Sequence, residues 1–204
     1  LNIYQNSINL GKTYASLGVG DAHVCSIVLD YSVRCWGNGD IGQLGINGVV
    51  DKSTPQSLGS NIQATQIDSG EQYSCMALQS GQGKCWGWNA YGQLGDGTTT
   101  TRKVPTTVNL PSGLSFDEIS AGGEHACGIV SNGTIMCWGA NTEGHLGDNT
   151  TTGKTTPAFV LGLPSNQSIK QVSTGYQHTC ALLENQTVMC WGYNGYGQLG
   201  DNTY

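Results

Sequence analysis

Short hydrophobic runs, separated by glycine-rich turns, recur along the whole chain and predict β-strands rather than helices. Residues 118–121 form one such run, which ends at Gly122-Gly123. Residues 125–130 and 134–138 form two further runs, joined by Ser131-Asn132-Gly133. A three-residue connection that ends in glycine is a common hairpin loop. The segment therefore predicts a small antiparallel sheet.

The same arrangement occurs four times, with a period of about 50 residues. The triplet Cys-Trp-Gly stands at 35–37, 85–87, 137–139 and 190–192, and a near-copy of the phrase GYNGYGQLG begins at each glycine. The repeat units are approximately 1–50, 51–102, 103–155 and 156–204, which makes the chain a single repeat array without a second domain. Several short strands in each repeated unit predict an all-β fold, namely a β-propeller.

The repeated pattern xGxxHxxxL…GxVxxWGxNxxGQLG resembles the repeat of the regulator of chromosome condensation family over nearly the full length. The resemblance implies a seven-bladed propeller, so the four units are expected to form part of a larger ring. It also implies a rigid scaffold whose variable loops meet a protein partner. In this sequence the units differ at 46–53, 98–103 and 150–155. The paired cysteines are more similar to secreted and bacterial members of the family than to nuclear ones.

All eight cysteines fall into pairs whose members are ten residues apart. If 131–133 is the hairpin loop, Cys127 lies directly opposite Cys137, at a Cβ separation of ~4.5–5.5 Å that is close to disulfide reach. The same register predicts four disulfides, namely Cys25–Cys35, Cys75–Cys85, Cys127–Cys137 and Cys180–Cys190. Each would stabilise the fold by up to about 2.8 kcal/mol. Disulfides persist in oxidising compartments, which favours an extracellular or cell-surface location.

Two other roles for the cysteines stay open at this point, namely reduced packing residues and metal ligands. His125, Cys127 and Cys137 form a possible three-ligand set, but Tyr73 replaces the histidine in the second unit. The cysteine spacing also lacks the short gap of a zinc knuckle. The favoured interpretation is therefore a disulfide framework without a metal site.

The repeated aromatic and polar residues have a structural interpretation. Trp138 is expected to face Ala126 across the hairpin and to pack between neighbouring blades. The histidines are expected to bond nearby backbone within their own blades, and they are His23, His125 and His178, with the Tyr73 hydroxyl in the same role. We call the nine residues that begin at the glycine of each Cys-Trp-Gly triplet the glycine phrase. Its asparagines are expected to cap its turn, namely Asn89, Asn141 and Asn194. Trp88 occurs in one unit only, which makes it a candidate contact residue.

The charge balance narrows the choice of partner. Eight Lys and Arg against 14 Asp and Glu give a net charge of −6, so nucleic-acid binding through a basic face is not expected. No apolar run reaches ~18 residues, so membrane insertion is not expected either. Asp96, Asp148 and Asp201 suggest calcium only weakly, because each supplies a single carboxylate. No catalytic set or cofactor-binding motif is present.

Four N-x-S/T sequons fall in predicted loops and are possible glycosylation sites, namely Asn132, Asn149, Asn166 and Asn185. They matter only if the chain passes through a eukaryotic secretory pathway. Their number is close to what chance gives for this composition.

We interpret the chain as an extracellular, non-enzymatic binding or structural module whose partner is another protein or a second copy of itself. One alternative is a guanine-nucleotide exchange or chromatin-associated propeller, and another is a carbohydrate-binding propeller. The chain begins at Leu1, and its last unit stops early, so we expect part of a longer chain or assembly. An open arc is expected to expose apolar surface around Trp36 or Trp191. The alternative is a closed four-bladed ring, in which the N-terminal strand completes the last blade.

Overall fold

The computed structural model describes residues 14–204, which form 15 strands in four antiparallel sheets. The first sheet consists of β1 (Tyr14–Val19), β2 (His23–Val28), β3 (Val33–Gly37) and β4 (Lys52–Ser57). The second consists of β5 (Ala64–Ser69), β6 (Tyr73–Leu78), β7 (Gly83–Gly87) and β8 (Arg102–Thr107). The third consists of β9 (Phe116–Ala121), β10 (His125–Val130), β11 (Ile135–Gly139) and β12 (Lys154–Phe159). The last consists of β13 (Ile169–Thr174), β14 (His178–Leu183) and β15 (Val188–Gly192).

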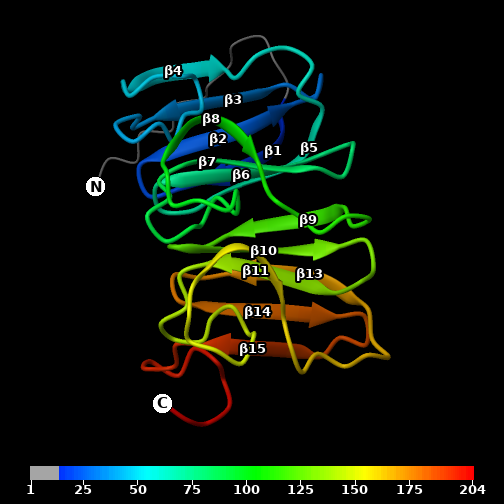
Figure 1. Cartoon of the computed structure of the whole chain (residues 1–204). Coiled ribbons are helices and arrows are strands. Elements are labelled where there is room, and N and C mark those ends of the chain that lie inside the picture. Colours follow the sequence, from blue (N-terminus) through cyan, green and yellow to red (C-terminus); the bar gives the residue numbers. More distant parts are fainter. Residues whose placement is uncertain (1–13) are drawn as a thin grey trace, which may run out of the picture.

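Each sheet is a meander whose strands pair in chain order. The first strands of successive sheets contact one another in the order β1, β5, β9 and β13. The four sheets follow one another along the array, from blue to red (Figure 1). This is the blade arrangement of a propeller, so the all-β prediction is confirmed. Among the described residues there is no helix, and hence none that could cross a membrane.

The outermost strand of each complete sheet comes from the sequence that opens the next repeat unit. Strand β4 lies just after the expected boundary at residue 51, and the boundaries near 102 and 155 fall within β8 and β12. Each blade therefore borrows its last strand from the following unit. The borrowed strand pairs with the third strand of the preceding unit's sheet, so backbone hydrogen bonds tie each unit to the next.

The central hairpin has the predicted register. Cys127 pairs with Cys137 and Ala126 pairs with Trp138. The corresponding cysteines pair in the same way in the other three sheets. Strand β9 begins slightly before the run expected from the sequence, because Phe116 still pairs with Val130 beyond a β-bulge.

The alternation of side chains gives each sheet two different faces. One face carries the cysteines and the other carries the tryptophan. The cysteine face of each sheet packs against the tryptophan face of the next one, which produces three buried clusters. Trp86 and Trp138 are fully buried in these contacts. The core of the molecule is therefore divided among the three contacts between sheets.

The two ends of the array are open, because the first and last sheets lie at opposite ends of the stack (Figure 1). Among residues 14–204, the first and last sheets do not meet to close a small ring. Of the two tryptophans around which exposed apolar surface was expected, Trp191 is partly buried and packs against the third sheet. At this end Val188, on the opposite face of the last sheet, is 60% exposed.

At the other end, Leu17 is 59% exposed, whereas Ile119 at the same repeat position is 1% exposed. Trp36 is partly buried. The segment before residue 14, which contains Leu10, lies outside the described residues. The exposed apolar surface predicted for an open arc is thus present at both ends, through Leu17 at one end and Val188 at the other.

Candidate functional site

The four predicted disulfides are present, joining Cys25–Cys35, Cys75–Cys85, Cys127–Cys137 and Cys180–Cys190. The first three pairs are buried, and the last pair is partly exposed. The described residues hold no free cysteine. Because their sulfur atoms are bonded to each other, the cysteines are neither reduced packing residues nor metal ligands. Within residues 14–204, no group of three or more His, Cys, Asp or Glu side chains is placed to hold a metal ion.

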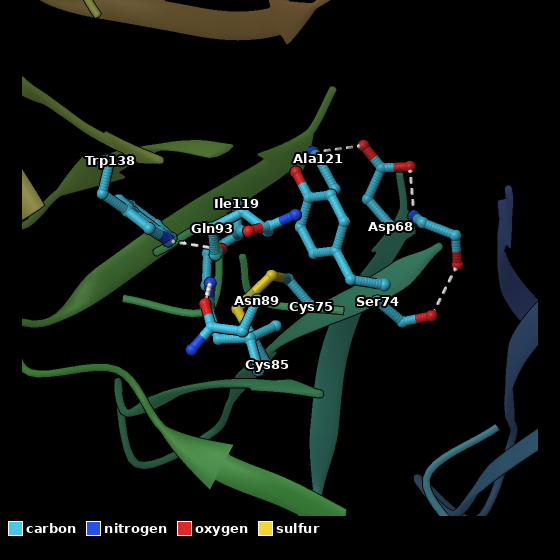
Figure 2. The surroundings of a disulfide bond; sticks show 12 residues. Asp68, Ser74, Cys75, Cys85, Asn89, Gln93, Ile119, Ala121 and Trp138 are labelled. Atoms are coloured by element: carbon cyan, nitrogen blue, oxygen red, sulfur yellow. Dashed lines mark hydrogen bonds between the residues drawn. A yellow bond between two sulfur atoms is a disulfide. The ribbon is translucent and has the colours of Figure 1, made fainter. Parts of the chain in front are cut away.

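The glycine phrase forms a clasp for the next blade. The indole nitrogen of Trp138 donates a hydrogen bond to the backbone carbonyl of Gln93 at 2.9 Å (Figure 2). Gly95 adopts a φ of +68°, and a Cβ there would lie 2.8 Å from the indole nitrogen of Trp138. Only glycine meets both requirements. The equivalent bonds join Trp86 to Gln43 and Trp191 to His145.

The bonds predicted within single blades are wrong for His23, His125 and Tyr73, because their side chains reach into the next blade. Nε2 of His23 lies 2.8 Å from the hydroxyl of Ser74, and Nε2 of His125 lies 2.8 Å from the hydroxyl of Thr179. Tyr73 follows the same rule, since its hydroxyl donates to the backbone carbonyl of His125 at 2.5 Å. These residues join sheets rather than stabilise hairpins.

The residue on the next blade explains why this repeat position holds histidine in some units and tyrosine in another. Where the next blade offers a hydroxyl, the ring is an imidazole. Where it offers the small Ala126, the longer Tyr73 reaches past it to the backbone. His178 is partly exposed on the open face of the last sheet, where the described residues supply no such hydroxyl.

The first strands of the four sheets, β1, β5, β9 and β13, are the inner strands of the array. Side chains of β5 and β9 bond backbone amides at the unpaired edge of the next inner strand. The side-chain oxygen of Gln66 accepts a hydrogen bond from the amide of Ile119 at 2.6 Å. The carboxylate of Asp68 accepts from the amide of Ala121 at 2.9 Å (Figure 2), and Glu118 does the same for β13 at 3.4 Å. Burial raises the pKa of the Asp68 and Glu118 carboxyls. These bonds satisfy edge groups that would otherwise invite aggregation.

The asparagines of the glycine phrase cap its turn, as predicted. The side-chain oxygen of Asn89 accepts from the amide of Leu94 at 2.9 Å, and its nitrogen donates to the carbonyls of Thr98 and Thr100. Asn141 and Asn194 make the equivalent bonds to the amides of Leu146 and Leu199.

The aspartates that suggested calcium are used within the same loops. The carboxylate of Asp96 bonds Thr98 and forms an ion pair with Arg102 at 2.7 Å. Asp148 pairs with Lys154 at 3.3 Å. The hydrogen bonds and the nearby cations lower the pKa of both carboxyls, although partial burial opposes them. The aspartates therefore fasten the loops.

One end of the array gathers the long loops, and we call it the loop face. It is formed by residues 37–51, 87–101, 139–153 and 192–204, together with the short turns that follow the four inner strands. Trp88, the candidate contact residue, lies here, partly exposed, and its ring packs edge-on against Tyr91 with centroids 5.3 Å apart. Tyr193 and Tyr196 form a similar pair at 6.0 Å. The loop face thus carries aromatic side chains in the open.

Tyr176 links these aromatic pairs to a group of carboxylates. It is 56% exposed and lines a depression of about 400 Å³ with Tyr193 and Tyr196. It also lines a second depression, of about 290 Å³, that lies between the ends of the inner strands. Asp21 and Glu71 line this second depression, and its described lining holds no Lys or Arg.

The carboxylates of Glu71, which lines the second depression, and of Glu124 influence each other and Tyr176. The charges of Glu71 and Glu124 raise the pKa of the Tyr176 hydroxyl, which also bonds Glu71. Partial burial, and then the charge of Glu71, raise the pKa of Glu124. A group of carboxylates without a nearby cation produces a negative potential that attracts positively charged groups. We call the whole set the aromatic–acidic surface, and it consists of Asp21, Glu71, Trp88, Tyr91, Glu124, Tyr176, Tyr193 and Tyr196.

Sequence analysis found Trp88 but missed the rest of this surface. A signal was present, because Asp21, Glu71 and Tyr176 occupy the same repeat position, two residues before the interlocking His or Tyr. Only the packing of the blades shows that these positions meet around one axis.

The four sequon asparagines are all exposed. Asn132, Asn166 and Asn185 lie at the end of the array opposite the loop face. Asn149 lies on the loop face, with a φ of +59°. Glycans at the first three positions would leave the aromatic–acidic surface uncovered.

Comparison with known proteins assigns the family. Models of the regulator of chromosome condensation (RCC1) repeat match residues 32–77, 85–129 and 132–182, and a second model of this repeat matches 116–144 and 169–198. The chain belongs to this repeat family.

Similar proteins include the ultraviolet-B receptor UVR8 of Arabidopsis thaliana, which is 30% identical over 93% of this chain and 43% of that protein. Prp20p of Saccharomyces cerevisiae superposes with a TM-score of 0.80 at 22% identity, over 95% of this chain and 48% of that one. The ectodomain of the receptor kinase CR4 of Physcomitrella patens superposes with a TM-score of 0.62 at 26% identity, over 95% of this chain and 45% of that one. The chain thus spans less than half the length of each of these proteins.

Proposed function

We propose that this chain is an extracellular, non-enzymatic propeller module that binds a protein partner through its aromatic–acidic surface. The observation that carries the proposal is the exposure of Trp88, Tyr91 and Tyr176 next to carboxylates that no Lys or Arg of the described lining neutralises. Tyrosine and tryptophan are enriched among the residues that dominate binding energy at protein interfaces. Carboxylates steer and orient a partner of opposite charge. We therefore expect the partner segment to carry Lys or Arg.

The absence of enzymatic activity is proposed because the repeated polar residues already have structural partners. His125, Tyr73 and Asn89 each hold a neighbouring blade or loop. Asp96 and Asp148 each hold a loop through an ion pair. Accelerated nucleotide release from a small GTPase, at catalytic amounts of this chain, would contradict this part of the proposal.

The extracellular location is supported by the four disulfides and by the likeness to a receptor-kinase ectodomain. It is tested on the protein purified from its natural source without reductant. The intact mass should rise by about eight protons on reduction, because all eight cysteines are paired. Eight free thiols in the native protein would contradict both the disulfides and the location.

The binding surface is tested with a matched pair of variants. The double variant Trp88→Ala/Tyr176→Ala removes two exposed rings of the loop face. The control, Leu161→Ala, removes a side chain that is 52% exposed at the opposite end. A partner captured by the unchanged chain should bind the double variant at least ~10-fold more weakly, since hot-spot rings contribute more than about 1.4 kcal/mol. The control should bind normally, and binding should weaken as salt is added.

Equal binding by the double variant and the unchanged chain would overturn the assignment of the surface. Carbohydrate binding is the alternative function, because sugars stack on exposed aromatic side chains. Binding of a glycan that tolerates high salt and is lost in the double variant would favour that function instead.

We also propose that further blades cover the open face of the last sheet, either from a longer chain or from a second copy. This is supported by Val188, which is 60% exposed, while Ile135 at the same repeat position is fully buried. A compact monomer of 21.5 kDa whose strands β14 and β15 resist hydrogen exchange would contradict it.

A further inference from the structure

One residue of the glycine phrase departs from its repeat in a way that changes the chemistry of a contact between sheets. The repeat position holds Gln43, Gln93 and Gln198, but the third unit holds His145. Each glutamine accepts a hydrogen bond from the amide two residues before it, at 2.9 to 3.0 Å. His145 is 1% exposed, and neither of its ring nitrogens has a partner among the described residues.

His145 lies against a second buried imidazole, that of His125. The two ring centroids are 4.6 Å apart. Nε2 of His125 is bonded to the hydroxyl of Thr179, while its Nδ1 has no partner among the described residues. Three buried ring nitrogens therefore lack partners at one contact. A buried polar group without a partner costs free energy, and the histidine leaves two ring nitrogens unpaired where each glutamine has a bonded side-chain oxygen.

No carboxylate among the described residues stabilises a protonated form of His125 or His145. From β14, the hydroxyl of Thr179 bonds the backbone carbonyl of His145, and His178 disfavours a charge on His125. From β15, the indole of Trp191 bonds the same carbonyl. From β6, the hydroxyl of Tyr73 bonds the backbone carbonyl of His125. No Asp or Glu of the described residues forms a hydrogen bond or ion pair with either ring.

We propose that the contact between the third and last sheets is an acid-sensitive seam, which loosens when the His125–His145 pair takes up protons. The neutral rings, whose centroids are 4.6 Å apart, can share a dry contact, but a charge on either buried ring costs free energy because no counterion among the described residues compensates it there. Within the described residues the last sheet packs against another sheet on one face only, so in this chain without covering blades it can separate while the rest of the array stays folded. Separation would also move Tyr176 and Tyr193 relative to Trp88, which couples the seam to the loop face.

The sign of the effect follows from the two states of the rings. Burial lowers the pKa of His125 well below its usual value, and it lowers the pKa of His145 although the backbone carbonyl of Ala140 opposes that shift. In the separated state both rings return to a pKa near 6.5. The contribution of the neutral pair to the closed seam is therefore complete above about pH 6.5 and is lost as the pH falls below it.

The other two contacts between sheets serve as internal controls. The contact between the second and third sheets uses Tyr73 and the backbone carbonyl of Gln93, which take up no proton in mild acid, and it uses Asp68, whose carboxyl pKa is raised by burial. The contact between the first and second sheets uses one histidine, His23, whose pKa is lowered by burial to about 4. The three contacts therefore hold one, zero and two buried imidazoles, in chain order.

The test is hydrogen exchange of the complete chain between pH 7.5 and 5.0, corrected for the intrinsic exchange rate at each pH. Each proton taken up on opening raises the opening constant by at most tenfold per pH unit. Because the open-state pKa is near 6.5, each ring contributes a factor of about 5 between pH 6.5 and 5.5, so opening of strands β13–β15 should increase up to ~30-fold while β6 and β7 change little. Uniform exchange across all sheets, or none that depends on pH, would overturn the proposal.

The variant His145→Gln restores the residue of the other three units and is expected to fold. It should reduce the increase at β13–β15 to about 5-fold, because a single imidazole remains. A pH dependence equal to that of the unchanged chain would overturn the proposal. A second readout is the nuclear magnetic resonance titration of the imidazole Cε1–H signals. If both rings of the closed protein titrate near pH 6.5 without increased exchange, the seam is not acid-sensitive.

Discussion

The cysteine face of the third sheet and that of the last sheet carry equivalent residues in two different environments. On the third sheet Ile129, Ile135 and the Cys127–Cys137 bond are buried against the next blade. On the last sheet Leu182 and the Cys180–Cys190 bond are partly exposed, and Val188 is 60% exposed. The strands have the same register in both cases. The neighbouring blade, and not the local sequence, decides whether this face is a core.

The polar residues show the same difference. His125 reaches a hydroxyl in the next blade, and Gln66 bonds the edge of the next inner strand. His178 and Gln171 occupy the same repeat positions on the last sheet, where the described residues offer neither partner. Each repeat unit is therefore built to hold the one that follows. The contacts between blades are where substitutions should have their largest effects.

The largest expected difference between the two environments is at the first position of β11 and β15. Ile135→Ala should lower the free energy of unfolding by about 2–5 kcal/mol, since it opens a cavity between the third and last sheets. Val188→Ala should cost less than about 1 kcal/mol, because its side chain is already in solvent. Urea unfolding of both variants measures the difference. Equal losses would show that Val188 is covered in solution.

The second comparison separates backbone strain from packing in the clasp. Gly95 and Gly200 have nearly the same φ, +68° and +69°, but a Cβ at Gly95 meets the indole of Trp138 and a Cβ at Gly200 meets nothing within 4 Å. Both alanine variants should lose about 1–2 kcal/mol through left-handed backbone strain. Gly95→Ala should lose a further ~1–3 kcal/mol through overpacking. Thermal unfolding of the two variants measures this gap, and its absence would contradict the clasp.

The smallest expected effect concerns the hydrogen bonds at the edges of the inner strands. Gln66→Ala removes the acceptor of the Ile119 amide and should cost about 1 kcal/mol. Gln171→Ala, at the same repeat position on the open sheet, should be close to neutral. Hydrogen exchange of the Ile119 amide should increase in the first variant and stay unchanged in the second. An unchanged amide in Gln66→Ala would mean that another group protects it.

Much of the fold was predictable because local rules set it. The ten-residue cysteine spacing and the loop at 131–133 defined the hairpin register, and the structure places Cys127 opposite Cys137. The role of Asn89 was predictable for the same reason, since its bond to Leu94 lies within one turn. The partners of His23 and His125 were not predictable, because Ser74 and Thr179 lie more than 50 residues away in the sequence.

The sequence by itself determined the repeat, the strand order within each blade, the cysteine pairs and the family, because each depends on neighbours within about 50 residues. The tertiary structure alone decided which side chains meet across blades. It placed Trp138 on the carbonyl of Gln93, set His145 against His125, and brought Asp21, Glu71 and Tyr176 around one depression. These contacts depend on the angle and spacing at which successive sheets pack. That geometry comes from the burial of whole faces, which no single repeat unit contains.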